Sequence, residues 1–168
     1  MNPLIITAVL SLLILANPVF GQKAKAEPNT VDHAGILGQL GPKNFAKGQA
    51  IYNNLCINCH GSDGKTPTLP IARAFGTGEL KFGVDPYSMF QTLTKGNGLM
   101  GPQTWMTPQE RYNAIHYIRE KFMKPMHPNY QALTPQYLAG LPKVNAVAAI
   151  SERVERDFGP ALASQLGR

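Results

Sequence analysis

The sequence predicts an all-α fold with few helices and long irregular connections. Two stretches, 44–55 and 108–121, carry apolar residues at helical spacing. Strand signals are weak, because no two runs of alternating β-branched residues are joined by a tight hairpin turn. The chain also holds 16 glycines and 14 prolines among its 168 residues, which favours irregular segments between the helices.

The first expected helix begins at Asn44 as its N-cap and places Phe45, Gln49 and Tyr52 to Leu55 at helical spacing. Gly48 lies inside this stretch and costs up to about 1 kcal/mol relative to alanine in a helix. Such a cost requires a packing reason. A close crossing with another helix would supply one.

Two further helices are expected in the second half of the chain. The stretch 108–121 has Thr107 as N-cap, Pro108 at the first position and Glu110 in the first turn, where a carboxylate complements the helix dipole. A shorter helix is capped by Asp85 and ends at Gly96. The longer helix has one apolar side, formed by Tyr112, Ile115, Ile118 and Phe122, with Tyr117 beside them.

The strongest motif is Cys56-Ile57-Asn58-Cys59-His60, the attachment pattern of a c-type haem. On a helical turn the two sulfurs share one face, where they can add to the two vinyl groups of one porphyrin while His60 becomes an axial iron ligand. The chain has only these two cysteines, so a four-ligand zinc site lacks ligands. A thioredoxin-like pair would need a βαβ context, and a disulfide here would close only a very short loop. We therefore expect one covalent haem c.

Two segments resemble parts of a known family. The stretch 44–52, followed by the haem motif and Gly61, resembles the N-terminal helix of a class I c-type cytochrome, and 111–119 is similar to its C-terminal helix. The resemblance covers residues 44–124 and implies the monohaem cytochrome c fold, with three to four helices around the haem. It also implies that the two helices cross, so that Gly48 and Tyr52 meet Tyr117.

The resemblance implies further residues around the haem. The carbonyl of a proline in the turn-rich loop 61–70 would accept a hydrogen bond from Nδ1 of His60, and both Pro70 and Pro67 fit. Tyr52 is expected beside the cofactor. Trp105 is expected either to pack in the core or to donate its indole N–H to a haem propionate.

The resemblance also implies that the sixth iron ligand is a methionine in the loop several residues before the last helix. Met100 stands seven positions before Thr107, which leaves slack for it to reach the iron, whereas Met106 abuts that cap. We therefore expect Met100 to be the ligand, with Met106 as the alternative. The rival ligands are histidines, each of which has a simpler account as a solvated or packing residue: His33, His116 and His127.

The ends of the chain divide it into four parts. Residues 1–21 contain an apolar stretch typical of a signal peptide, although the absence of lysine and arginine before it leaves an uncleaved membrane anchor as the alternative. Residues 22–42 are expected to be linker, and 43–124 the cytochrome c domain. Residues 125–168 form a Pro-containing tail with an amphipathic helix expected from Val144 to Phe158, which would pack back on the domain or dock a partner.

These observations predict a periplasmic or otherwise extracytoplasmic one-electron carrier, not an enzyme, that serves redox partner proteins such as periplasmic dehydrogenases. The alternative is a haem enzyme or a gas or peroxide sensor with an open sixth position. The net charge of +6 suits an acidic protein partner or an anionic membrane. Nucleic acid is the weakest of the three interpretations, because the chain has no basic run with interleaved aromatics. Six lysines could ring the haem edge or simply be solvated surface: Lys43, Lys47, Lys65, Lys81, Lys95 and Lys121.

Overall fold

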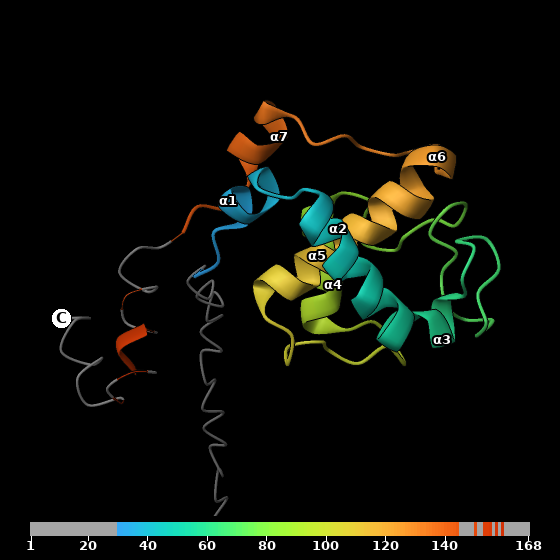
Figure 1. The fold of residues 1–168 in the computed structure, drawn as a ribbon, viewed down its shortest axis with the longest axis horizontal. Helices are drawn as coiled ribbons and strands as arrows, with labels where there is room; N and C mark the ends of the chain where they lie inside the picture. Colours follow the sequence, from blue (N-terminus) through green and yellow to red (C-terminus); the bar gives the residue numbers. More distant parts are fainter. Residues whose placement is uncertain (1–29, 145–149, 151–152, 156, 158, 160–168) are drawn as a thin grey trace, which may run out of the picture.

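The computed structural model describes residues 30–144 together with 150, 153–155, 157 and 159 (Figure 1). This part of the chain is helical and contains no strand, which confirms the all-α prediction. Two short π-helical turns, labelled η, interrupt the helices. The elements in chain order are α1 (His33–Gly38), α2 (Pro42–Ile51), η1 (Tyr52–Cys56), α3 (Ile57–His60), α4 (Pro86–Lys95), α5 (Pro108–Ile118), η2 (Arg119–Met123), α6 (Lys124–Met126) and α7 (Pro135–Gly140).

The helix that leads into the cysteine motif begins earlier than expected. Its N-cap is Gly41 and Pro42 occupies the first helical position, so Asn44 is not the cap. Asn44 lies in the first turn, where its Oδ1 accepts a hydrogen bond from the Gly41 N–H at 3.1 Å. A proline at the first position loses no hydrogen bond, because that N–H has no partner within the helix. The chain then continues through η1 into α3 without a break.

Helices α2 and α5 cross in close contact, as expected (Figure 1). A Cβ added to Gly48 would lie 1.9 Å from the carbonyl oxygen of Asn113 and 2.9 Å from Cβ of Tyr117, so only glycine fits there. The Tyr52 and Tyr117 rings lie 5.3 Å apart, and Phe122 packs against both. The crossing therefore forms the centre of the core.

The two later helices keep their expected caps. Asp85 Oδ1 accepts hydrogen bonds from the N–H groups of Tyr87 and Ser88, and α4 ends at Gly96 with a positive φ of 76°. Thr107 and Glu110 form a reciprocal capping box at the start of α5. The last helix runs further than expected, because η2 and α6 extend it to Met126.

The segment expected to be linker is folded where the structure describes it. Asp32 caps α1 through the Gly35 N–H at 2.9 Å, and His33 in α1 is only 2% exposed. The His33 ring is enclosed by Tyr87, Phe90 and Tyr112. The prediction of a linker over 22–42 is therefore wrong for residues 30–41, because buried aromatic contacts hold this segment on the domain.

The beginning of the expected tail is also part of the domain. Helix α7 lies beside α1 (Figure 1), and the Tyr137 hydroxyl donates to Asp85 Oδ1 at 2.6 Å. The boundary at 124 is thus too early, because α7 packs against α1 and Tyr137 bonds to the start of α4. Residues 1–29 and most of the expected helix from Val144 to Phe158 lie outside the described residues. Among the described helices, none combines the length and apolar character needed to cross a membrane.

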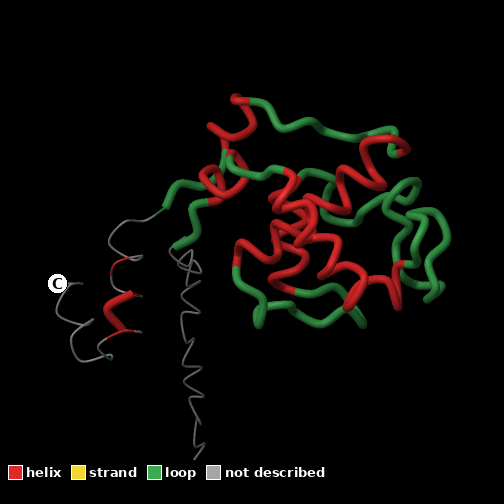
Figure 2. Tube along the Cα trace, in the orientation of Figure 1, coloured by secondary structure: helices red, strands yellow, loops and turns green. Residues whose placement is uncertain are grey.

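Two long loops shape one side of the molecule. One joins α3 to α4 and the other joins α4 to α5, and both contain little regular structure (Figure 2). Short hydrogen bonds pin them: the Leu69 N–H donates to the Cys59 carbonyl at 3.0 Å, and the Gln103 N–H donates to the Leu93 carbonyl at 2.7 Å. The loops thereby lie against α3 and α4.

Candidate haem site

A large cavity of about 590 Å³ lies between α3 and the two long loops. Cys56, Cys59 and His60 line it from the cysteine motif, and Met100 and Met106 line it from the loop before α5. Its remaining walls are mainly apolar and include Met89, Leu93, Ile115 and Ile118. The structure thus brings both cysteines, the motif histidine and both candidate methionines to one cavity.

His60 is oriented by the loop that follows α3. Its Nδ1 lies 3.0 Å from the carbonyl oxygen of Arg73, and its ring stacks on Phe75 with centroids 4.4 Å apart. Because a carbonyl only accepts, Nδ1 carries the proton and the lone pair belongs to Nε2. A ligating histidine in a protein is commonly fixed in this way.

The acceptor for His60 differs from the expected prolines. It is Arg73, so the assignment of Pro70, with Pro67 as the alternative, is wrong. The Leu69 N–H is bound to the Cys59 carbonyl, which keeps the loop beside α3 through the proline region. The carbonyl that meets the His60 ring is that of Arg73, three residues after Pro70. Sequence reasoning missed this residue because a backbone acceptor carries no side-chain signal.

Burial shifts the pKa values of His60 and Cys56 in the motif. Burial lowers the pKa of His60, although the hydrogen bond to Arg73 acts in the opposite direction. The imidazole is therefore neutral at pH 7. Burial, with a smaller contribution from Cys59, raises the pKa of Cys56 to about 11, so this thiol is protonated at neutral pH.

Tyr52 lies behind the motif and does not line the cavity. It is fully buried in the core, and its hydroxyl donates to the Gly61 carbonyl at 2.7 Å. Burial raises its pKa, so the hydroxyl keeps its proton. The expectation of a residue beside the cofactor is corrected: Tyr52 fixes the backbone directly after His60.

Trp105 is neither a core residue nor a lining residue of the cavity. Its side chain is 65% exposed, and its Nε1–H donates to Gln103 Oε1 at 3.1 Å. The core interpretation is wrong because the short loop between Gln103 and the α5 cap turns Met106 inward, 4% exposed, and leaves Trp105 outside. Gln103 itself lines the cavity.

The two methionines have different surroundings. Met100 is half-buried, and its backbone pairs with Asn97 through hydrogen bonds of 2.8 and 3.2 Å. Met106 is buried directly before the Thr107 cap. The choice of Met100 as an iron ligand stays a prediction.

Of the described histidines, only His60 lines the cavity. His33 Nδ1 is 2.8 Å from the Tyr112 hydroxyl, and His116 packs edge-on against Phe45 at 6.1 Å. His127 accepts a hydrogen bond from the Asn129 N–H and lies 3.1 Å from the Gly78 carbonyl. All three occupy packing positions, and His33 is buried rather than solvated.

Two cationic side chains also line the cavity. Arg73 and Lys81 are the charged side chains among its described lining residues. A haem has broad apolar faces and two carboxylates at one edge. Apolar walls, two thiols, an oriented imidazole and two cations therefore fit that group.

A comparison with protein families identifies the same segment. Residues 43–118 match the family described as cytochrome c oxidase, cbb3-type, subunit III. This part of the chain is a c-type cytochrome domain, a class that holds haem c covalently and transfers electrons through it. Searches of curated proteins and of solved structures gave no match for the chain.

Proposed function

We propose that this protein is an extracytoplasmic one-electron carrier whose haem c is attached to Cys56 and Cys59. In this proposal His60 Nε2 and Met100 Sδ would ligate the haem iron. The observation that carries it is the Nδ1–H bond from His60 to the Arg73 carbonyl, which directs Nε2 as the ligating atom in the cavity that also holds both thiols.

The residues of the site each have a defined part in this function. When bound, haem c would accept and release one electron reversibly at its iron. The cysteine thiols would attach it, and the apolar walls would exclude water from the cavity around it. His60 is held by a backbone carbonyl and by the Phe75 ring, which fixes the orientation of the imidazole. A thioether as the other ligand favours a relatively high reduction potential.

The surroundings of the domain are part of the same proposal. The N-terminal stretch would act as a leader or an anchor that exports the domain. The six lysines named above are all exposed, which supports an electropositive surface for an acidic redox partner. A periplasmic dehydrogenase is the kind of partner that would use such a carrier.

Mass spectrometry of the exported protein tests the attachment. We expect the added mass of one haem in the wild type, and none that resists denaturation in the double variant C56S/C59S. A bare polypeptide from a strain with a working haem c maturation system would overturn the proposal.

Ligand-binding spectra test the carrier against a haem enzyme or sensor. A six-coordinate carrier is low-spin in the ferric state and binds cyanide slowly, because Met100 must first leave the iron. High-spin ferric haem that binds cyanide immediately would instead show an open site and exclude the carrier assignment.

A further inference from the structure

One loop supplies most of the environment of His60. We call residues 73–84 the wall loop. Its first residue provides the carbonyl that accepts from His60 Nδ1, and Phe75 stacks on the imidazole. Further along, Leu80 and Phe82 line the cavity. The loop has no helix or strand to hold it, so contacts from other segments must fix its place.

His127 binds the middle of the wall loop. It is 6% exposed, and its Nδ1 accepts a hydrogen bond from the Asn129 N–H at 3.1 Å. Since Nδ1 is an acceptor, the ring proton is on Nε2, which donates to the Gly78 carbonyl at 3.1 Å. The Nδ1 bond to Asn129 thus fixes the ring orientation within the C-terminal chain, and the Nε2 bond connects that chain to the loop.

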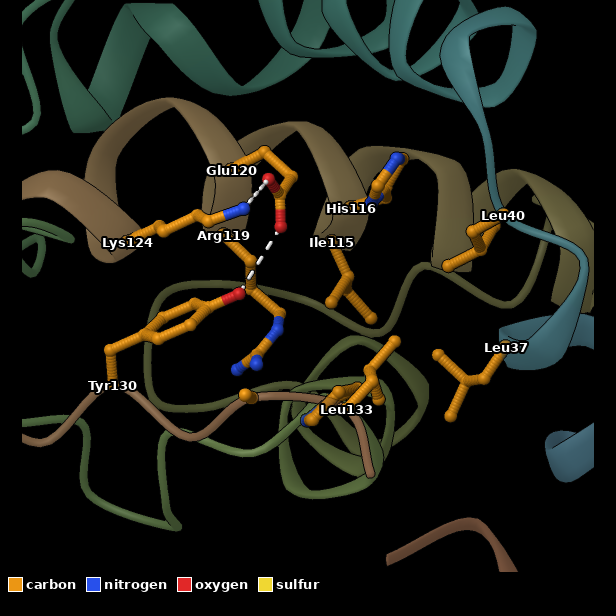
Figure 3. Close-up of a pocket in the computed structure, with 11 residues that line it drawn as sticks. Leu37, Leu40, Ile115, His116, Arg119, Glu120, Lys124, Tyr130 and Leu133 are labelled. Atoms are coloured by element: carbon orange, nitrogen blue, oxygen red, sulfur yellow. Dashed lines mark hydrogen bonds and ion pairs between the residues drawn. The ribbon is translucent and has the colours of Figure 1, made fainter. Parts of the chain in front are cut away.

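Arg119 binds the end of the wall loop. The residue is 3% exposed, and its guanidinium donates to the carbonyls of Val84 and Gln131. Tyr130 lies beside it, with the guanidinium carbon 4.8 Å from the ring centroid (Figure 3). Burial lowers the pKa of Arg119, and a buried cation that lost these acceptors would be strongly unfavourable. The side chain therefore holds two backbone segments together.

A third contact lies near the start of the loop. A Cβ added to Gly76 would lie 2.7 Å from Cε of Met126, and the Gly76 N–H donates to the Gly64 carbonyl at 2.7 Å. The chain from 119 to 131 thus meets the wall loop at Gly76, Gly78 and Val84. We call residues 119–131 the C-terminal strap. It follows directly after the family match, which ends at residue 118.

We propose that the C-terminal strap positions the wall loop and thereby sets the hydrogen bond between His60 and Arg73, with His127 as the positioning residue. The proposal rests on the proposed function, because the strength of this bond matters when His60 ligates iron. A stronger bond makes the imidazole a more basic ligand and favours ferric iron. The strap is therefore a determinant of the reduction potential, although it lies outside the cavity.

Two substitutions at one position separate this role from simple packing. In His127→Gln the side-chain amide reaches the place of Nε2 and keeps the donor to Gly78. In His127→Asn the shorter amide keeps the acceptor for Asn129 and loses Gly78. His116→Gln is the matched control, because His116 is a half-buried histidine whose ring packs against Phe45.

Hydrogen exchange and redox titration of the holoprotein measure the outcome. In His127→Asn we expect peptides from the wall loop to exchange about three- to tenfold faster, in line with the loss of one hydrogen bond, while peptides from α2 and α5 are unchanged. We also expect its midpoint potential to rise, because the bond to His60 weakens. His127→Gln and His116→Gln should match the wild type in both readouts.

Two results would overturn the proposal. One is a wall loop that exchanges at the wild-type rate in His127→Asn, and the other is an equal change in the Asn and Gln variants. Both measurements use protein in which mass spectrometry has confirmed one attached haem. A wrong proposal for the strap is thereby distinguished from a wrong assignment of the haem, because the latter would show as a wild-type protein without haem.

Discussion

His33 is a titratable group enclosed by aromatic rings. Its Nδ1 lies 2.8 Å from the Tyr112 hydroxyl, and the rings of Tyr87 and Phe90 lie within 5 Å. Burial lowers its pKa; Asp32 opposes the shift and Arg111 adds to it. The folded protein therefore prefers neutral His33.

This preference predicts acid destabilisation. Above pH 6.5, the ordinary pKa of histidine, His33 is neutral in both states and its contribution is complete. As the pH falls below 6.5, the unfolded chain takes up a proton that the folded protein resists, so the free energy of unfolding decreases. In His33→Asn we expect a loss of about 1–3 kcal/mol at pH 7 and a shallower decrease towards pH 5.

Urea unfolding of the holoprotein at pH 7, 6 and 5 measures this effect. His116→Gln is the control, because burial also lowers the pKa of this half-buried histidine. An unchanged slope against pH in His33→Asn would show that His33 does not drive the acid destabilisation.

The two methionines predict different responses to truncation. Met100→Ala should remove the weak near-infrared sulfur-to-iron charge-transfer band of the ferric protein. Met106→Ala should keep that band and lower the free energy of unfolding by about 2–4 kcal/mol, because Met106 is 4% exposed. The band lost in Met106→Ala and kept in Met100→Ala would reverse the ligand assignment.

At the level of the elements, the crossing of α2 and α5 depends on one glycine. Gly48→Ala would force a methyl group against the Asn113 carbonyl at 1.9 Å, so the helices must separate. We expect a loss of about 3 kcal/mol or more, at the upper end of overpacking in cores.

Gly140→Ala is the matched control for this crossing. A Cβ at that glycine, in α7, would meet no atom within 4 Å. It should be neutral or stabilise by less than about 1 kcal/mol, since alanine favours a helix. Thermal unfolding of both variants provides the comparison. Equal changes in stability would mean that the effect of Gly48→Ala reflects helix propensity alone and not the contact between the two helices.

The elements with local signals were those the sequence predicted correctly. Asp85 and Thr107 cap their helices as expected, because a cap needs only neighbouring residues. The glycine at the crossing was also predicted. The assignment of Asn44 as N-cap was wrong, because Asn44 lies at the N3 position of α2. Its side chain still accepts a backbone N–H in the first turn, that of the cap residue Gly41.

In the site, too, the residues with a local sequence motif were predicted correctly, and those whose position depends on tertiary structure were not. The cysteines, His60 and the methionines were identified from the sequence, and the structure brings them to one cavity. The position of Tyr52 beside the cofactor and the core interpretation of Trp105 were wrong, because inward or outward orientation depends on tertiary packing. The interpretation of Trp105 as a donor to a haem propionate stays a prediction. Arg73 was missed because its backbone oxygen, not its side chain, meets His60.

At the level of the whole molecule, the chain closes on itself through α1 and α7. Both lie outside the segment that matches the family, and both pack on the side of α4 and α5. No local pattern indicated this closure, because helices of six residues give too little periodicity to detect. The linker and tail predictions failed for that reason.

The hydrogen bonds of Tyr137 contribute to the free energy that holds α7 on the domain. Its hydroxyl donates to Asp85 Oδ1 at 2.6 Å and accepts from the Tyr87 N–H at 3.0 Å. Tyr137→Phe removes both bonds, and we expect a loss of about 1.5–3 kcal/mol because one partner is a carboxylate. The melting temperature should fall by about 3–12 °C for a chain of this size.

Tyr130→Phe is the control for this closure. Its hydroxyl donates to Glu120 Oε1 at 3.1 Å, and Glu120 keeps its ion pair with Lys124 in the variant. The loss should be below about 1 kcal/mol. Calorimetry of both variants compares them, and a larger effect in Tyr130→Phe would contradict the role of Tyr137.

The acceptor for His60 has a lasting consequence because it belongs to the main chain. Any amino acid at position 73 offers the same oxygen, so exchanging arginine there alters charge without removing the bond. Insertions or deletions between residues 61 and 73 would shift a different oxygen into place. Among homologues, redox tuning at this point should therefore follow loop length more closely than residue identity.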